Sequence, residues 1–194
     1  MATTISGTAG VTFPAGGLGN PAGAVVGTTD TQTLTNKTIQ GGAITSGTVV
    51  ASTSGTSIDF TSIPSWVKRI TVNFVGVSTN GTSNYQVQIG ASSFTTSGYL
   101  GASTDGPVLT STAFTTGFGI RTASASAIIH GAMVINLVTG NTWVAAGTLA
   151  RSDGAAFISS AGSLALGGTL DRVRITTVNG TDTFDAGSIN ILYE

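Results

Sequence analysis

VKRITVNFVGV, residues 67–77, alternates apolar and polar side chains along its length. This alternation predicts a β-strand, because successive side chains of a strand point to opposite faces of a sheet. We expect Ile70, Val72 and Phe74 to lie on the core face, with the residues between them facing solvent. The strand therefore indicates a sheet with one face packed against a core.

A hairpin is predicted directly after this strand. Asn80-Gly81 is a pair that readily adopts the positive φ angles of a tight hairpin turn. Residues 85–89 then alternate again, and on this interpretation Gln86 and Gln88 point to solvent while their neighbours enter the core. The two strands would lie side by side in one sheet.

Further strands follow at intervals of about ten residues, separated by turn residues. Residues 127–138 alternate and are followed by Gly140-Asn141 and Trp143, which predicts a second hairpin. Weaker or shorter strands are expected at residues 57–60, 94–100, 113–120, 155–164, 173–177 and 188–193. Roughly eight to ten strands without helix signals predict an all-β domain over residues 47–194, a jelly-roll-like or related antiparallel β-sandwich.

Residues 1–46 have a different composition. They are rich in Gly, Ala and Thr, and they place Pro14 and Pro21 among glycines, a pattern that breaks both helices and central strands. Their few apolar side chains cannot close a core. We expect an extended arm that becomes ordered against a partner, with a flexible tail as the alternative.

The low charge of the chain indicates self-association. Charged residues make up 8% of the sequence, against about 25% in typical soluble domains, and such a neutral surface suits burial against neighbouring chains. The net charge is -1 and the seven basic residues are scattered, so we expect no nucleic-acid partner. No apolar run is long enough to span a membrane, and residues 1–5 lack a secretory signal, so we expect synthesis in a cytoplasm and no membrane insertion.

The residues needed for common enzyme chemistry are absent or isolated. The chain has no cysteine and one histidine, His130, which lies within a predicted strand and is expected to be structural. We expect no catalytic residues, no cofactor and no metal site. Asp182 and Asp185 are the best carboxylate pair for a glycosidase, but their polar turn favours backbone bonding over catalysis or calcium binding.

Two tryptophans could serve as stacking platforms for sugars. Trp66 and Trp143 each lie beside core-like residues, so core packing is the favoured interpretation. The polar loop at residues 97–107 is a second candidate for recognition of a host surface, because polar loops on a rigid scaffold often carry binding.

Three segments carry a resemblance to a known group of proteins. TDTQTLTNKT at residues 29–38 resembles a segment that recurs in bacteriophage tail fibres and other virion structural proteins. IDFTSIPSWVKRIT at residues 58–71 and FDAGSINILYE at residues 184–194 are similar to the beginning and end of a β-domain common in such proteins.

The resemblance implies a virion protein made in the host cytoplasm, with an arm docked on the particle and a β-domain projecting outward as a trimer. A short tail fibre or fibre-like component is the first expectation. The alternatives are a capsid or neck decoration or adaptor protein, and a module that binds a glycan or protein of the host surface. By the same resemblance, attachment would involve Thr31, Gln32, Thr33, Leu34, Thr35, Asn36 and Lys37.

Overall fold

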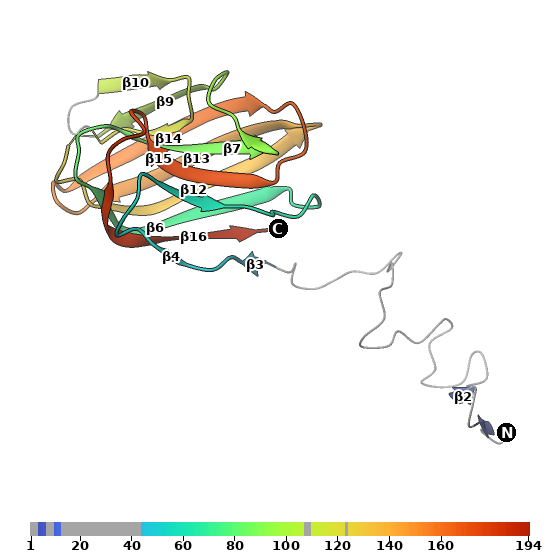
Figure 1. The fold of residues 1–194 in the computed structure, drawn as a ribbon. Coiled ribbons are helices and arrows are strands. Elements are labelled where there is room, and N and C mark those ends of the chain that lie inside the picture. Colours follow the sequence, from blue (N-terminus) through green and yellow to red (C-terminus); the bar gives the residue numbers. More distant parts are fainter. Residues whose placement is uncertain (1–3, 7–9, 13–43, 107–109, 123) are drawn as a thin grey trace. The chain divides into compact units, whose positions relative to one another are not determined.

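A computed structural model describes residues 4–6, 10–12, 44–106, 110–122 and 124–194 (Figure 1). The chain divides into two compact units, residues 1–41 and 42–194. In the first unit, β1 (Thr4–Ser6) pairs antiparallel with β2 (Gly10–Thr12). The second unit begins within the expected arm, since Thr45 and Ser46 already belong to one of its sheets.

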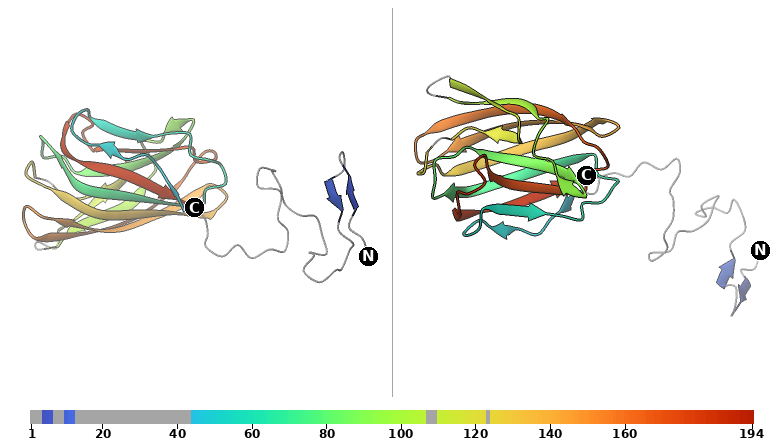
Figure 2. Two further views of the ribbon diagram at one scale, coloured as in Figure 1. Left: turned by 90° about the horizontal axis from the view of Figure 1, so that it is seen from below. Right: turned by 45° about the horizontal axis from the view of Figure 1, so that its top comes forward.

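The second unit is built of antiparallel strands arranged as two facing sheets (Figure 2). The described residues contain no helix, and thus none that is long and apolar enough to cross a membrane. The expected all-β, antiparallel sandwich is confirmed. Its strands are β3 (Thr45–Ser46), β4 (Val50–Ala51), β5 (Ser57–Phe60), β6 (Arg69–Thr79), β7 (Tyr85–Ala91), β8 (Ser93–Phe94), β9 (Leu100–Asp105), β10 (Thr110–Phe114), β11 (Phe118–Ile120), β12 (Ile129–Thr139), β13 (Thr142–Arg151), β14 (Ala156–Ala165), β15 (Arg172–Thr177) and β16 (Phe184–Tyr193).

The two sheets differ in width. The 9-stranded sheet has the order β10-β9-β14-β13-β12-β6-β16-β3, and β4 also pairs with β16. The 5-stranded sheet has the order β11-β7-β15-β5, and β8 pairs with β7. The chain changes sheets repeatedly, so most neighbouring strands are distant in sequence.

The core fills the space between the sheets. The alternation at residues 67–77 orients the strand as expected, because Ile70, Val72 and Phe74 are all buried. Met133 of β12 and Ile175 of β15 belong to the same buried cluster, one from each sheet. Burial of such side chains from two facing sheets is the main source of stability for this architecture.

The second predicted hairpin is confirmed and the first is wrong. β12 pairs with β13 from Ile129↔Arg151 to Thr139↔Thr142, and the turn uses Gly140 at φ 54°. By contrast, β6 and β7 lie in different sheets. The segment containing Asn80-Gly81 crosses between them, and Asn80 supports the crossing by accepting a hydrogen bond from the Thr183 amide at 2.9 Å.

Two further expectations fail near β7. Residues 94–100 do not form one strand: the chain turns through Gly98 at φ 82°, and the Tyr99 hydroxyl accepts a hydrogen bond from the Ile89 amide at 2.8 Å. Gln86 and Gln88 are buried rather than exposed. Thr116 covers them, since its hydroxyl donates to Gln86 Oε1 at 2.7 Å and its carbonyl accepts from Gln88 Nε2 at 2.9 Å.

Candidate functional site

The outer face of the 9-stranded sheet carries a row of small uncharged residues. Strand register places one outward-facing residue from each of seven neighbouring strands in line. The row is Ala113, Ala102, Ala161, Ala146, Val134, Thr71 and Leu192. The four alanines are exposed. Side chains as short as alanine leave the backbone of these four strands open to contact.

The rows on either side are also nearly free of charge. The row on one side is Ser111, Thr104, Ser159, Thr148, Ala132, Asn73 and Asn190. The row on the other side is Leu100, Ser163, Val144, Asn136, Arg69 and Glu194, and Leu100 is 73% exposed. Phe157 of β14 is 69% exposed on the same face. We call these three rows together with Phe157 the neutral face.

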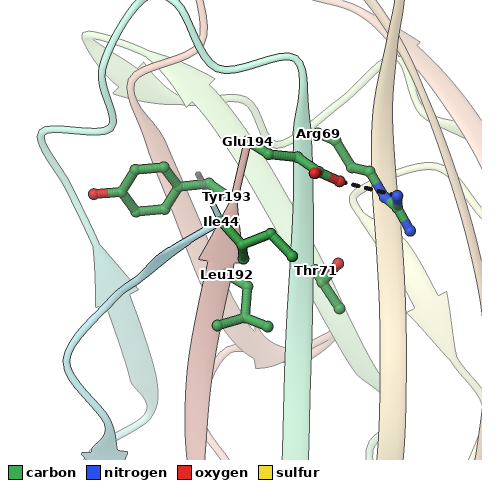
Figure 3. Close-up of a pocket in the computed structure, with 6 residues that line it drawn as sticks. All are labelled: Ile44, Arg69, Thr71, Leu192, Tyr193 and Glu194. Carbon is green, nitrogen blue, oxygen red and sulfur yellow. Dashed lines mark hydrogen bonds and ion pairs between the residues drawn. The ribbon is translucent and has the colours of Figure 1, made fainter. Parts of the chain in front are cut away.

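The only ionised side chains in the three rows of the neutral face are paired with each other. Arg69 Nη1 lies 2.9 Å from Glu194 Oε1 at the edge formed by β6 and β16. Figure 3 shows this pair beside a small pocket, where Ile44 lies over Leu192 and Thr71. Ile44 itself is 62% exposed. The neutral face therefore reaches Ile44 at the edge formed by β6 and β16.

Every arginine of the described chain has a carboxylate within 4 Å. Arg174 forms a two-point pair with Asp59, at 2.8 and 2.6 Å, and its guanidinium lies 4.0 Å from the centre of the Phe94 ring. Asp171 pairs in the same way with Arg172, and this hydrogen bonding lowers the pKa of Asp171. Such internal pairing leaves little free positive charge for a polyanion.

A buried ionic cluster closes one end of the sandwich. Asp105 is 5% exposed, and its Oδ2 atom lies 3.1 Å from Arg151 Nη1 and 3.8 Å from Arg121 Nη1. Its Oδ1 atom has no hydrogen-bond partner among the described residues. Arg151 also binds Asp153 at 2.7 Å, and this hydrogen bond lowers the pKa of Asp153. The cluster is internally neutralised, which favours a structural role.

His130 lies on β12 between two hydrogen-bond partners. Its Nδ1 atom accepts from the Gly76 amide at 3.2 Å, and its Nε2 atom is 3.2 Å from the Ser152 hydroxyl. Gly76 is at φ 64° in the bulged part of β6, so the imidazole satisfies an amide that the irregular ladder leaves free. These contacts support the structural role expected for His130.

The two candidate carboxylates are held by local hydrogen bonds. Asp182 accepts from the Ser83 amide at 2.9 Å and from Asn179 Nδ2 at 2.5 Å. Asp185 accepts from the Ser78 hydroxyl. No group of three or more His, Asp or Glu side chains within the described ranges is arranged to hold a metal ion. Asp182 thus organises the crossing from β15 to β16, as its turn sequence predicts.

The tryptophans separate into one buried and one exposed residue. Trp143 is 3% exposed and packs in the core, as expected. Trp66 is 54% exposed, so the prediction of core packing for this residue is wrong. Its ring centre is 5.8 Å from that of Tyr193, and the turn at residues 65–66 holds it at the rim of the sandwich.

The candidate attachment residues Thr31–Lys37 lie outside the described residues. Of the surfaces described above, sequence reasoning missed the neutral face, although alternating Ala, Ser and Thr in β9, β13 and β14 signals it. Comparisons with family models, curated proteins and solved structures found no match to this chain.

Proposed function

We propose that this chain is a structural protein of a bacteriophage virion, a short tail fibre or fibre-like component that assembles with copies of itself and has no catalytic role. The observation that carries the assembly part is the neutral face. Large uncharged surfaces with exposed hydrophobic residues mark protein contacts, and charged residues are depleted at the centre of interfaces. The virion assignment rests on the resemblance of the three sequence segments.

Strand order supports the finer proposal of a jelly roll. In that fold, eight strands in chain order form two facing sheets ordered 1-8-3-6 and 2-7-4-5. Numbering β4, β5, β6, β7, β11, β12, β15 and β16 from one to eight gives these two orders. Of the six remaining strands, β9, β10, β13 and β14 widen one sheet, and the two-residue strands β3 and β8 pair with β16 and β7. Jelly rolls are frequent in viral capsid and lectin domains.

The proposed absence of catalysis is supported by the engagement of the candidate carboxylates. Asp182 accepts hydrogen bonds from the Ser83 amide and from Asn179, and Asp185 accepts one from Ser78. The two carboxylates therefore serve separate local contacts. If a depolymerase activity existed at this pair, replacing both residues by Asn would abolish sugar release.

The assembly proposal is tested by placing a charge at the centre of the neutral face. Ala146→Arg puts a long cation on the exposed strand β13, where burial of an unpaired charge opposes assembly. In light scattering coupled to size-exclusion chromatography, we expect the native chain to have the mass of an oligomer, a trimer by resemblance, and the variant to be monomeric. Ala125→Arg, in an exposed turn that is not part of the neutral face, is the matched control. A monomeric native chain, or an unaffected Ala146→Arg oligomer, would contradict the proposal.

The virion part requires a separate experiment. A variant lacking residues 1–41 should form the same oligomer, because the second unit stays whole, but fail to join phage particles, because the proposed docking segment is removed. Antibody labelling of intact particles in the electron microscope would then distinguish a tail fibre from a decoration or adaptor protein on the capsid or neck. Normal incorporation of the shortened chain would refute the role of the arm.

A further inference from the structure

The outer face of the 5-stranded sheet contains a groove of about 310 Å³. Its floor is made by side chains of β7 and β15, and the walls come from residues near Thr56, Thr96 and Thr116. This volume is at the lower end of the range of about 300–1,000 Å³ found for ligand pockets. The groove is distinct from the neutral face, which belongs to the other sheet.

The floor of the groove is held rigidly by internal hydrogen bonds. Gln86 is 2% exposed, and its amide group bonds at both ends, to the Thr116 hydroxyl and to the Thr177 carbonyl. Arg174 is fixed by its two-point pair with Asp59. Side chains fixed before binding lose little rotamer freedom on contact with a ligand.

Several hydrogen-bonding atoms of the groove have no protein partner in the described structure. Gln88 donates to the Thr116 carbonyl through Nε2, which leaves Oε1 as an acceptor. Arg174 uses Nε and Nη2 for Asp59, which leaves Nη1 as a donor. The hydroxyl of Thr96 is free to donate or accept. The groove therefore offers both donors and acceptors to a ligand.

The charge of the groove is balanced. Asp59 neutralises Arg174 at 2.6 Å, and the other lining side chains are uncharged amides, hydroxyls and Val178. An anionic ligand would gain little here, because the guanidinium already has a carboxylate partner. An extended peptide would also gain little, since the main-chain groups on the floor are already paired with neighbouring strands.

We propose that this groove binds a neutral saccharide, one or two sugar residues long. Sugar hydroxyl groups both donate and accept hydrogen bonds, which matches the free atoms of Gln88, Arg174 and Thr96. The exposed Val178 at the rim provides an apolar contact for the C–H face of a sugar ring. This proposal does not depend on self-assembly or on the virion assignment.

The test uses the full chain and a defined panel of sugars. Glucose, galactose, mannose, N-acetylglucosamine and their disaccharides are titrated by calorimetry and ligand-observed NMR, with N-acetylneuraminic acid as an acidic probe. We expect a neutral sugar to bind with a dissociation constant of about 1 mM or tighter. Failure of every neutral sugar, or binding of the acidic probe alone, would overturn the proposal.

Two variants on opposite walls locate the site. Thr96→Trp and Thr56→Trp replace exposed lining residues and fill the groove, so each should weaken binding by more than about tenfold. Ser97→Trp, an exposed neighbour of Thr96 outside the lining, is the matched control and should bind as the native chain does. Thermal unfolding checks that each variant is folded. Unchanged affinity in both lining variants would place the sugar elsewhere and refute the site.

Discussion

Replacement of Asp105 by Ala is expected to destabilise the domain by about 3 kcal/mol. The Asp105 side chain is 7% exposed and the partner Arg151 side chain is 13% exposed, so the pair is buried. Removing one partner of a buried pair costs about 3–5 kcal/mol, because the other charge is left uncompensated. We expect the lower end of this range, since Arg151 keeps Asp153 at 2.7 Å.

Urea denaturation followed by tryptophan fluorescence measures this loss. Urea is uncharged and leaves ionic interactions unscreened, and protein concentration is held fixed because assembly would couple to unfolding. Glu194→Ala is the matched control. Its pair with Arg69 is half exposed, at 39% and 50%, and such surface pairs contribute about 0–1 kcal/mol. By thermal unfolding, Asp105→Ala should lower Tm by about 6–12 °C.

Arg121 provides an internal check on the same cluster. It lies 3.8 Å from Asp105 with its side chain 18% exposed. If the loss in Asp105→Ala comes from uncompensated cations, adding Arg121→Ala should cost less free energy than Arg121→Ala costs in the native chain. Additive effects of the two replacements, or equal losses in Asp105→Ala and Glu194→Ala, would refute the reasoning.

Two further predictions concern packing and pH. A Cβ atom at Gly119 would clash with Cγ of the Phe114 ring, so Gly119→Ala should lower the free energy of unfolding in urea by about 1–3 kcal/mol. Gly167 lies in open space, so Gly167→Ala should leave the free energy of unfolding unchanged. Equal stability of both variants would contradict this. Burial raises the pKa of Tyr85 from 10.0 to about 12, so the stability it contributes is complete below pH 10 and is lost as the pH rises through about 12. Tyr85→Phe should remove this part of the alkaline destabilisation, and an unchanged pH profile of unfolding would show that Tyr85 is not its source.

Local patterns in the sequence predicted individual strands more reliably than their partners. The alternation at residues 67–77 identified β6 and its core face, and the Gly140 turn identified the β12–β13 hairpin. Asn80-Gly81 failed as a hairpin signal because β6 and β7 join different sheets. A pair such as Asn-Gly can occur both in a hairpin turn and in a segment that crosses between sheets. The sheet that a strand joins therefore depends on contacts with residues distant in sequence.

Local sequence patterns also failed to predict which side chains on the outer faces of the sheets are buried. Gln86 and Gln88 follow the polar positions of an alternating strand, yet the segment containing Thr116 covers them from a separate part of the chain. Trp66 was expected in the core from its neighbours, but the turn that contains it projects the ring to the rim. Alternating Ala, Ser and Thr mark single strands of the neutral face, but their alignment in one row depends on a strand order that differs from the chain order.

The position of β16 has a consequence for synthesis. This strand lies between β6 and the short strands β3 and β4. Its three partners are made early, and β16 itself is made more than a hundred residues later. A nascent chain therefore exposes the unpaired edge of β6 to solvent until residues 184–193 have left the ribosome. The central row of the neutral face is completed at the same moment, since Leu192 is the last of its members to be made. Chains interrupted during translation would thus lack a finished surface for joining their neighbours.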